Sequence, residues 1–209
     1  MSITAQDFVD KLRLDLVDES AVTWTDPDLF ECLNEAIRAH CGLRTDSYVI
    51  NAYIPLVQGT VQNLPPGGIE VFDIFENEVS KRRVTIVDQE LLDEVSRFWP
   101  ADVQETDVKH FTHDPRDKPG FRVYPPNDGT GSVYATYGAV PDPVQASDLI
   151  PLADQHEPAL IARALAAAYR RNTLRQDLTK VQGFMQQFSV MLGLGAQAEN
   201  AAVPKGPGG

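Results

Sequence analysis

The order of segments constrains the fold more than any other feature, because helical patterns at both ends of the chain enclose a long, turn-rich middle. Residues 48–149 contain runs of β-branched and aromatic residues separated by clusters of proline and glycine. Such runs, joined by turns and not by crossover helices, favour a small antiparallel β sandwich or barrel. We therefore expect an α+β fold in which this β-rich domain is inserted into a helical domain made of residues 1–47 and 150–195. Residues 196–209 are small, polar and rich in proline and glycine, and we expect them to form an extended C-terminal tail.

The first helix is predicted to follow Thr4, which has the spacing of a capping box with Asp7. The apolar residues after this cap recur at helical spacing and share one face: Phe8, Val9, Leu12 and Leu16. We expect this face to pack against the rest of the helical domain.

The second helix is expected over Asp26–Cys41, with Thr25 as its N-cap and Gly42 as its C-terminal stop. Trp24 and Leu29 have the spacing of a hydrophobic staple around that cap, which sets the angle at which the chain enters the helix.

Both cysteines of the chain, Cys32 and Cys41, fall in this second helix. Nine helical residues separate them by ~13.5 Å and place them on opposite faces. A disulfide requires Cα atoms within ~7 Å, so the two cannot pair within one helix. We expect buried free thiols in a reducing cytosol.

In the middle segment, Tyr48–Thr60 alternates in part between apolar and polar residues, and strands are expected at Ile69–Phe75 and Arg83–Val87. Gln89–Phe98 has a helical pattern that ends at Trp99–Pro100.

Two further strands are expected in the middle segment, Phe121–Tyr124 and Val133–Tyr137. The residues between them are rich in proline and glycine. We expect two antiparallel strands joined by a long flexible loop.

The C-terminal segment is expected to be helical. Apolar residues recur at spacings of four and three over Leu174–Leu192, a seam suited to packing on another helix. We favour an intramolecular core for this seam over an interface. Thr173 and Gln176 have capping-box spacing, which leaves open whether residues 155–194 form one helix or two. Two glycines are expected to end the helical part: Gly193 and Gly195.

The charge balance excludes several classes of partner. Thirty acidic residues against eighteen Lys and Arg give a formal net charge of −12. This argues against binding to nucleic-acid phosphates and to anionic membranes. Because no window approaches the ~20 apolar residues of a membrane span, we expect no membrane partner, and the N-terminus has no secretory-signal pattern.

No catalytic or metal-binding constellation is visible. His110 and His113 lie near several aspartates, but the spacing matches no known metal site, and a polar loop is favoured. Phosphate-loop, nucleophile-elbow and calcium-loop patterns are absent. We therefore expect no enzyme activity, no cofactor and no metal.

Two basic groups could contact partners. Lys81–Arg83 form a short run at a predicted hairpin end, where a solvated surface is favoured over nucleic-acid contact. The C-terminal helices carry a cluster of arginines: Arg163, Arg170, Arg171 and Arg175. We expect these arginines to be solvated on a lone domain and able to pair with a neighbour's carboxylates in a ring of copies.

Several short motifs occur in a fixed order: Trp24-Thr25-Asp26, Leu33-Asn34-Glu35-Ala36, the run from Val57 to Pro65, Trp99-Pro100, the run from Phe121 to Pro126, Tyr137 with Pro141, and Ile150-Pro151-Leu152 before an alanine-rich helix with Tyr169. In this order the chain resembles the head-to-tail adaptor (connector) proteins of tailed bacteriophages, known from short-tailed phages as tail tubular or portal-adaptor proteins. The resemblance covers about residues 1–195.

The resemblance implies a structural virion protein and not an enzyme. Such proteins form a homo-oligomeric ring, usually of twelve copies, in the virion neck, and are made in the host cytoplasm. The helical part contacts the portal, the β part contacts the tail nozzle or tube, and DNA passes through the lumen without sequence-specific binding. By position, a C-terminal extension along the portal would include Val203, Pro204 and Lys205. The candidate residues for portal or neighbour contact are therefore Val203, Pro204, Lys205, Arg170, Arg171 and Arg175.

Two other functions stay open on the sequence alone. The first is a head-completion or tail-terminator protein of a long-tailed or contractile phage. The second, from a different class, is a small hydrolase or a carbohydrate-binding tail component, which would require a pocket with convergent polar groups.

Overall fold

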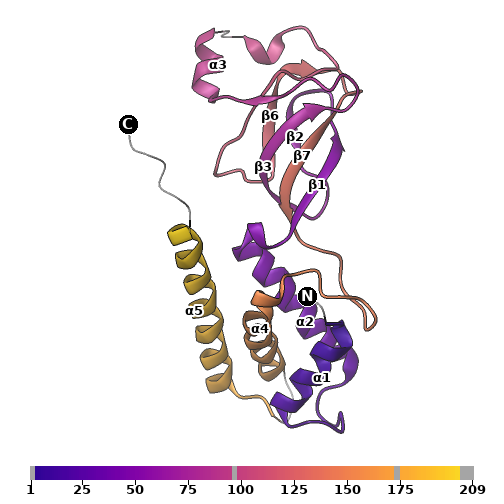
Figure 1. The fold of residues 1–209 in the computed structure, drawn as a ribbon, viewed down its shortest axis with the longest axis vertical. Coiled ribbons are helices and arrows are strands. Elements are labelled where there is room, and N and C mark those ends of the chain that lie inside the picture. Colours follow the sequence, from indigo (N-terminus) through magenta and orange to yellow (C-terminus); the bar gives the residue numbers. More distant parts are fainter. Residues whose placement is uncertain (1–2, 96–97, 172–174, 203–209) are drawn as a thin grey trace. The chain divides into compact units, whose positions relative to one another are not determined.

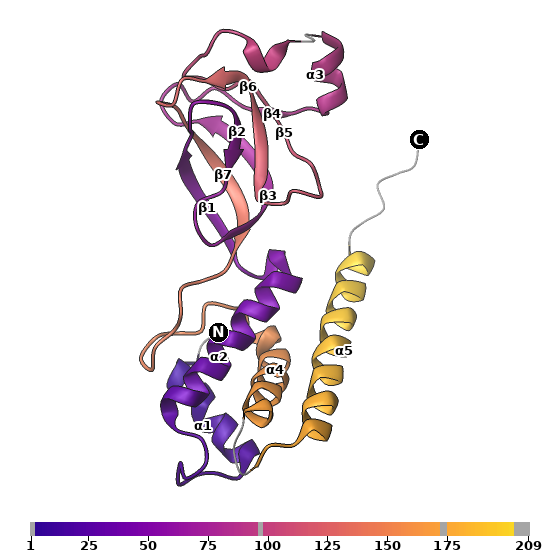
Figure 2. The same ribbon diagram turned by 180° about the vertical axis from the view of Figure 1, so that it is seen from behind.

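The computed structural model describes residues 3–95, 98–171 and 175–202, and its elements confirm the α+β fold (Figures 1 and 2). The chain divides into two compact units. We call Met1–Arg44 with Pro141–Gly209 the helical unit, and Thr45–Val140 the β unit. The sequence predicts domain divisions after residues 47 and 149.

Helix α1 (Ala5–Leu16) begins at the predicted capping box. The Thr4 hydroxyl accepts the Asp7 backbone N–H at 3.1 Å, and the Asp7 carboxylate accepts the Thr4 N–H at 3.0 Å. These reciprocal bonds satisfy donors that the first turn of a helix leaves unpaired. The whole predicted apolar face is buried: Phe8, Val9, Leu12 and Leu16.

Helix α2 (Asp26–Leu43) also begins with a capping box, formed by Thr25 and Asp28. Trp24 and Leu29 are fully buried, as the predicted staple requires. The predicted stop at Gly42 is wrong, because the helix continues to Leu43. A glycine inside a helix lowers the stability of the helix by about 1 kcal/mol relative to alanine. This loss does not end α2, because the helix also buries a face of apolar side chains. Both cysteines are free and buried, as predicted.

The C-terminal part forms two helices, α4 (Glu157–Arg170) and α5 (Leu178–Ala202). A short 3₁₀ turn, Asp154–His156, precedes α4. In both views α4 lies between α2 and α5 (Figures 1 and 2). The predicted cap residue Thr173 and the seam residue Leu174 lie outside the described residues.

Helix α5 does not end at Gly193 or Gly195 but continues to Ala202. The first residues of the segment 196–209, expected to be extended, are therefore helical. Alanine and glutamine in this stretch are good helix formers, which offsets the unfavourable propensity of the two glycines.

The chain returns from the β unit to the helical unit along a segment bonded to α1 and α2. The side chain of Asn34 on α2 donates to the Val144 carbonyl at 3.2 Å and accepts the Val144 N–H at 2.8 Å. The Ala5 N–H at the start of α1 donates to the Asp148 carbonyl at 2.8 Å. These bonds fix the returning segment before the 3₁₀ turn Asp154–His156 and α4.

The described residues of the β unit form seven strands in two sheets. A three-stranded sheet has the order β1-β7-β3, and a four-stranded sheet has the order β2-β6-β5-β4. Every pair is antiparallel except β4 with β5. The strands are β1 (Val49–Pro55), β2 (Gly59–Asn63), β3 (Gly68–Asn77), β4 (Thr85–Ile86), β5 (His110–Thr112), β6 (Gly120–Asn127) and β7 (Ser132–Ala139).

Strands β6 and β7 do not pair with each other, which corrects the predicted arrangement of these two strands. β6 pairs with β2 and β5, whereas β7 pairs with β1 and β3. The connection between them turns the chain from one sheet to the other. Asn127 is fully buried and fixes this connection, since its side chain accepts the N–H groups of Gly129 at 2.9 Å and Gly131 at 3.3 Å.

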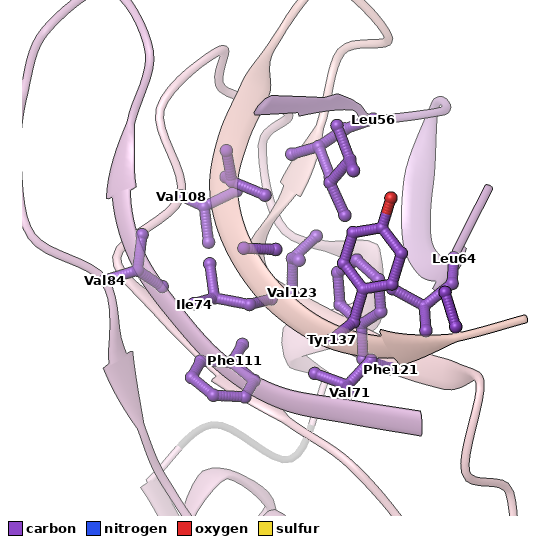
Figure 3. Packing of buried hydrophobic residues seen from close by; sticks show 14 residues of the cluster. Leu56, Leu64, Val71, Ile74, Val84, Val108, Phe111, Phe121, Val123 and Tyr137 are labelled. Carbon is purple, nitrogen blue, oxygen red and sulfur yellow. The ribbon is translucent and has the colours of Figure 1, made fainter. Parts of the chain in front are cut away.

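The two sheets bury a common hydrophobic core, shown in Figure 3. Along β7 the odd-numbered residues Val133, Ala135 and Tyr137 are buried, and β3 contributes Val71 and Ile74. The four-stranded sheet contributes Phe111, Phe121 and Val123. The alternation in β7 is the period-two pattern of a strand that is buried on one face. The buried residues of β3 are three apart because the register of β3 against β7 shifts between them.

The segment between β4 and β5 is less regular than the sheets. The strand predicted at Arg83–Val87 is limited to Thr85–Ile86, and α3 spans Gln89–Val95. A 3₁₀ turn at Trp99–Ala101 follows, in which Trp99 is buried and donates its indole N–H to Asp93 at 2.8 Å.

Candidate functional surfaces

Two of the predicted arginines on α4 bind the same carboxylate of α2. A guanidinium nitrogen of Arg163 lies 2.6 Å from Oε1 of Glu35, and Arg170 donates to both Glu35 oxygens at 2.8 Å. Arg163 and Arg170 are seven residues apart, so both lie on one face of the helix. The shared carboxylate therefore holds α4 against α2.

Arg171, directly after α4, binds two more acids of α2. It donates to Asp28 at 3.0 Å and to Glu31 at 2.7 Å. Partial burial acts to lower the pKa of Arg171, but the hydrogen bond to Glu31 and neighbouring groups outweigh it and raise that pKa. Burial also raises the pKa of the nearby Cys32 thiol, which keeps this thiol protonated.

Arg175 binds the C-terminal end of α1. Its guanidinium donates to the carbonyls of Leu16 and Val17, each at 3.2 Å, and lies 5.7 Å from the centre of the Trp24 ring. Cations are favoured at a helix C-terminus because the last carbonyls carry partial negative charge. Lys180 lies 4.4 Å from the centre of the Tyr169 ring, beside an open hollow of about 430 Å³.

The arginine cluster therefore differs from its expected state on a lone domain. Instead of being solvated, Arg163, Arg170 and Arg171 pair with carboxylates of their own chain, and Arg175 binds backbone carbonyls. The Arg170 side chain is 57% exposed, so one side of this residue also faces outward.

Helices α4 and α5 form an apolar groove of about 410 Å³ on the helical unit. Ile161 and Leu165 of α4 face Phe184 and Met191 of α5 across it, and Asp15 of α1 lies at its edge. The groove is a candidate contact surface, because apolar patches on a monomer mark interaction sites when they are contiguous.

The apolar seam of α5 is divided between core and surface. Phe188 is buried and packs with Ala159 and Ala162 of α4. Leu178 is 64% exposed, and Met185 is also exposed. The favoured core assignment holds for Phe188, while the exposed positions remain available for contacts with another molecule.

The outer face of the three-stranded sheet carries a row of aromatic rings, a surface that the sequence analysis missed. Tyr53 of β1, Tyr134 of β7 and Phe75 of β3 line a shallow groove of about 660 Å³ together with Asn51, Glu76 and Thr136. The ring centres of Tyr53 and Tyr134 are 5.0 Å apart, and those of Phe75 and Tyr134 are 6.2 Å apart. The alternation of buried and exposed residues in β1 and β7 could have placed Tyr53 and Tyr134 on an exposed face. It could not have placed Phe75 and Glu76 there together, because the register of β3 shifts at this point.

A charged pair lies at one side of this aromatic groove. Oε1 of Glu76 accepts the Tyr53 hydroxyl at 2.9 Å and the Lys81 ammonium at 3.2 Å. These two hydrogen bonds lower the pKa of Glu76, the Tyr53 bond most of all. The basic run Lys81–Arg83 follows β3 and the turn after it, where a hairpin end was predicted.

His110 and His113 are not brought together as ligands of a metal. Nδ1 of His110 lies 2.6 Å from the Thr85 hydroxyl, and the His110 ring stacks on Tyr124. Within residues 3–95, 98–171 and 175–202, no group of three or more His, Cys, Asp or Glu side chains could hold a metal ion.

Among the described helices, none combines the length and the apolar composition needed to cross a bilayer. The other candidate contact residues, Val203, Pro204 and Lys205, lie outside the described residues.

Comparison with known proteins supports one family. The family model described as SU10 adaptor protein matches residues 3–207, nearly the whole chain and both units. No curated protein matches the chain.

Proposed function

Because the chain belongs to the SU10 adaptor protein family, we propose that it is a head-to-tail adaptor, which forms a ring between the portal and the tail of a bacteriophage virion. The family consists of structural phage proteins and is not an enzyme family. The observation that carries the proposal is the family match across residues 3–207, since it covers both units.

The proposed ring contains about twelve copies in the virion neck. A closed ring uses heterologous contacts, so each copy must offer two different surfaces that fit each other. We propose that two apolar surfaces of the helical unit make these contacts. One is the α4–α5 groove, and the other is the end of α1 with the turn after it, where Leu14, Val17 and Val22 are exposed.

We further propose that the two compact units act as separate domains with different partners. The helical unit contacts the portal and the β unit contacts the tail nozzle or tube. Arg170, Arg171 and Arg175 are candidate residues for the portal or neighbour contacts. Val203, Pro204 and Lys205 are candidates at the end of the chain.

DNA passes through the ring without sequence-specific binding in this proposal. The formal charge of −12 on each copy supports this assignment, because an acidic lumen repels phosphates and lets DNA slide. Salt screens this repulsion beyond about 10 Å, so it acts close to the wall of the lumen.

The test is to add the purified chain to portal rings of the same phage. Electron microscopy of the mixture should show a second ring of density, with about twelve adaptor copies for each portal. Mass photometry of the same mixture measures the copy number. Portal rings that stay bare at high concentrations of the chain would contradict the proposal, and density on a tail tube alone would favour a tail-terminator role instead.

A further inference from the structure

The aromatic groove of the β unit has the chemistry of a binding site for a peptide. Its three rings come from three neighbouring strands: Tyr53 from β1, Tyr134 from β7 and Phe75 from β3. Tyr134 on the central strand β7 lies opposite Tyr53 on β1 and opposite Glu76 on β3 in the register of the sheet. The rings therefore form a row across the sheet on its outer face.

This row of rings is a surface and not part of the core. Each ring neighbours a buried residue in its own strand, Ile54, Val133 or Ile74, whose side chain points into the sandwich. Tyr53 is 38% exposed and Phe75 is 37% exposed. A partner that covers these exposed rings would remove apolar surface from water, which lowers the free energy of the complex.

The groove is organised by polar contacts. The Lys81 ammonium lies 4.7 Å from the centre of the Tyr53 ring, and Lys81 and Tyr53 both donate to Oε1 of Glu76. The Thr136 hydroxyl donates to the side-chain oxygen of Asn51 at the other side of the groove. These contacts fix Tyr53 and place a carboxylate beside the rings, and a preorganised site loses less entropy on binding.

Aromatic-lined grooves recognise proline-rich segments in the polyproline II conformation. Prolines three residues apart lie on the same side of this helix, ~9 Å from each other, because it has three residues in each turn of 3.1 Å rise per residue. The chain carries one such pair with a lysine between its members, Pro204-Lys205-Gly206-Pro207. Lys205 is the only cation within residues 196–209, and the groove offers it the carboxylate of Glu76.

We propose that the aromatic groove of one copy binds residues 203–207 of a second copy. Pro204 and Pro207 pack on the ring row formed by Tyr53, Tyr134 and Phe75, and Lys205 pairs with Glu76. The inference rests on the proposed ring only as the source of a second copy. Each copy then donates one segment and receives another, which is the head-to-tail pattern of a closed ring.

The binding test uses a labelled peptide with the sequence of residues 199–209, titrated into the full chain and followed by fluorescence anisotropy. Saturable binding is expected, and it should be stronger to a chain that ends at Ala202, because that chain has no segment of its own to compete. Replacing both prolines of the peptide by alanine should weaken binding about tenfold, the effect of losing an anchor in an aromatic pocket.

Two matched protein variants locate the site. Phe75→Ser removes a ring from the groove and should weaken peptide binding about tenfold. Phe98→Ser removes a ring that is 74% exposed and outside the groove, and it should bind as the wild type does. Thermal unfolding of each variant shows whether the fold is retained, and Tyr53→Ser replaces Phe75→Ser if the latter is unfolded. Equal binding by the groove variants and the wild type would overturn the proposal.

A second experiment identifies the copy that is bound. A photocrosslinking residue is placed at position 206, to which the proposal assigns no contact, in an isotopically heavy chain, which is mixed with light chain carrying no crosslinker. Crosslinks from heavy chain to the light peptides that contain Tyr53, Phe75 or Tyr134 are expected. Crosslinks to other light peptides, or crosslinks only within the heavy chain, would overturn the proposal that the groove binds residues 203–207 of a second copy. Since both experiments omit the portal, their failure is distinct from failure of the ring to form.

Discussion

Oε1 of Glu35 lies 2.6 Å from a guanidinium nitrogen of Arg163, across 128 residues of sequence. The Arg163 side chain is only 13% exposed, so its charge depends on this partner. Glu35 also binds Arg170, which makes it the common acceptor between α2 and α4.

The variant Glu35→Gln should therefore destabilise the chain by about 1–3 kcal/mol, because it leaves a mostly buried arginine without a countercharge. Urea unfolding followed by circular dichroism measures the loss. Glu31→Gln is the matched control, since Glu31 pairs with Arg171 at an exposed position and such pairs contribute about 0–1 kcal/mol. Equal losses of unfolding free energy in the two variants would show that the pairing of Glu35 with Arg163 contributes no more than an exposed ion pair.

We expect the stability of the helical unit to depend on pH through Asp18. Burial acts to raise the pKa of its carboxyl, but hydrogen bonds from the backbone N–H groups of Trp24, Thr23 and Val22 outweigh burial and lower this pKa. A lowered pKa in the folded state adds stability above the unfolded-state value of about 3.9, and this stability is lost as pH falls through the folded-state pKa.

At neutral pH, Asp18→Asn should be less stable than the wild type by about 1–3 kcal/mol. The difference should shrink as the pH is lowered below about 4, because the wild-type carboxyl becomes protonated too. Chemical unfolding of both proteins across this range gives the difference directly. A difference that does not change with pH would mean that packing, and not charge, explains the effect.

Gly138 on β7 has no room for a side chain. A Cβ at this position would lie 2.2 Å from the Thr45 carbonyl oxygen and 3.0 Å from the Phe72 ring. Gly138→Ala should cost about 1–3 kcal/mol, because the Thr45 backbone must move. Gly183→Ala in α5 is the control, since a Cβ there meets nothing within 4 Å and alanine favours the helix by about 0.5–1 kcal/mol. Thermal unfolding should shift in opposite directions in the two variants.

The apolar groove between α4 and α5 should be needed for assembly and not for folding. Met191→Glu places a charge in the groove and should lower ring formation on the portal about tenfold. Val79→Glu is matched to it, because Val79 is 88% exposed in the turn after β3. Mass photometry of chain and portal mixtures compares the two. If both variants assemble as the wild type does, the groove is not the contact surface between copies.

Removal of residues 203–209 tests the end of the chain. A chain ending at Ala202 should keep its thermal unfolding temperature, because a segment rich in proline and glycine buries little apolar surface. Ring formation on the portal should fall, since each copy loses one proposed contact. Sedimentation velocity measures assembly, and a lowered unfolding temperature without any loss of assembly would contradict this prediction.

Features set by neighbouring residues could be predicted from the sequence. The caps at Thr4 and Thr25 and the apolar face from Phe8 to Leu16 depend on spacings within one or two turns. The α+β class could also be predicted, because it depends only on where each pattern occurs along the chain.

Features set by distant partners could not be predicted. The alternation in β6 and β7 shows which residues face the core, but not that the two strands belong to different sheets. The sequence does not indicate the partners of Arg163 in α4 and of Arg171 after it, because Glu35 and Asp28 lie more than a hundred residues away. The aromatic groove was missed for the same reason, since its three rings come from strands that only the fold makes neighbours.

The pairing of β1 with β7 brings the two ends of the β unit together, because β1 is the first strand of this unit along the chain and β7 is the last. Val49 pairs with Gly138, and the Tyr48 carbonyl accepts the Ala139 N–H at 3.0 Å. Entry and exit of the inserted segment are thus adjacent, so a short linker could join residues 44 and 141. The β unit therefore meets the geometric condition for a domain inserted into another, which is that both of its ends leave from one place.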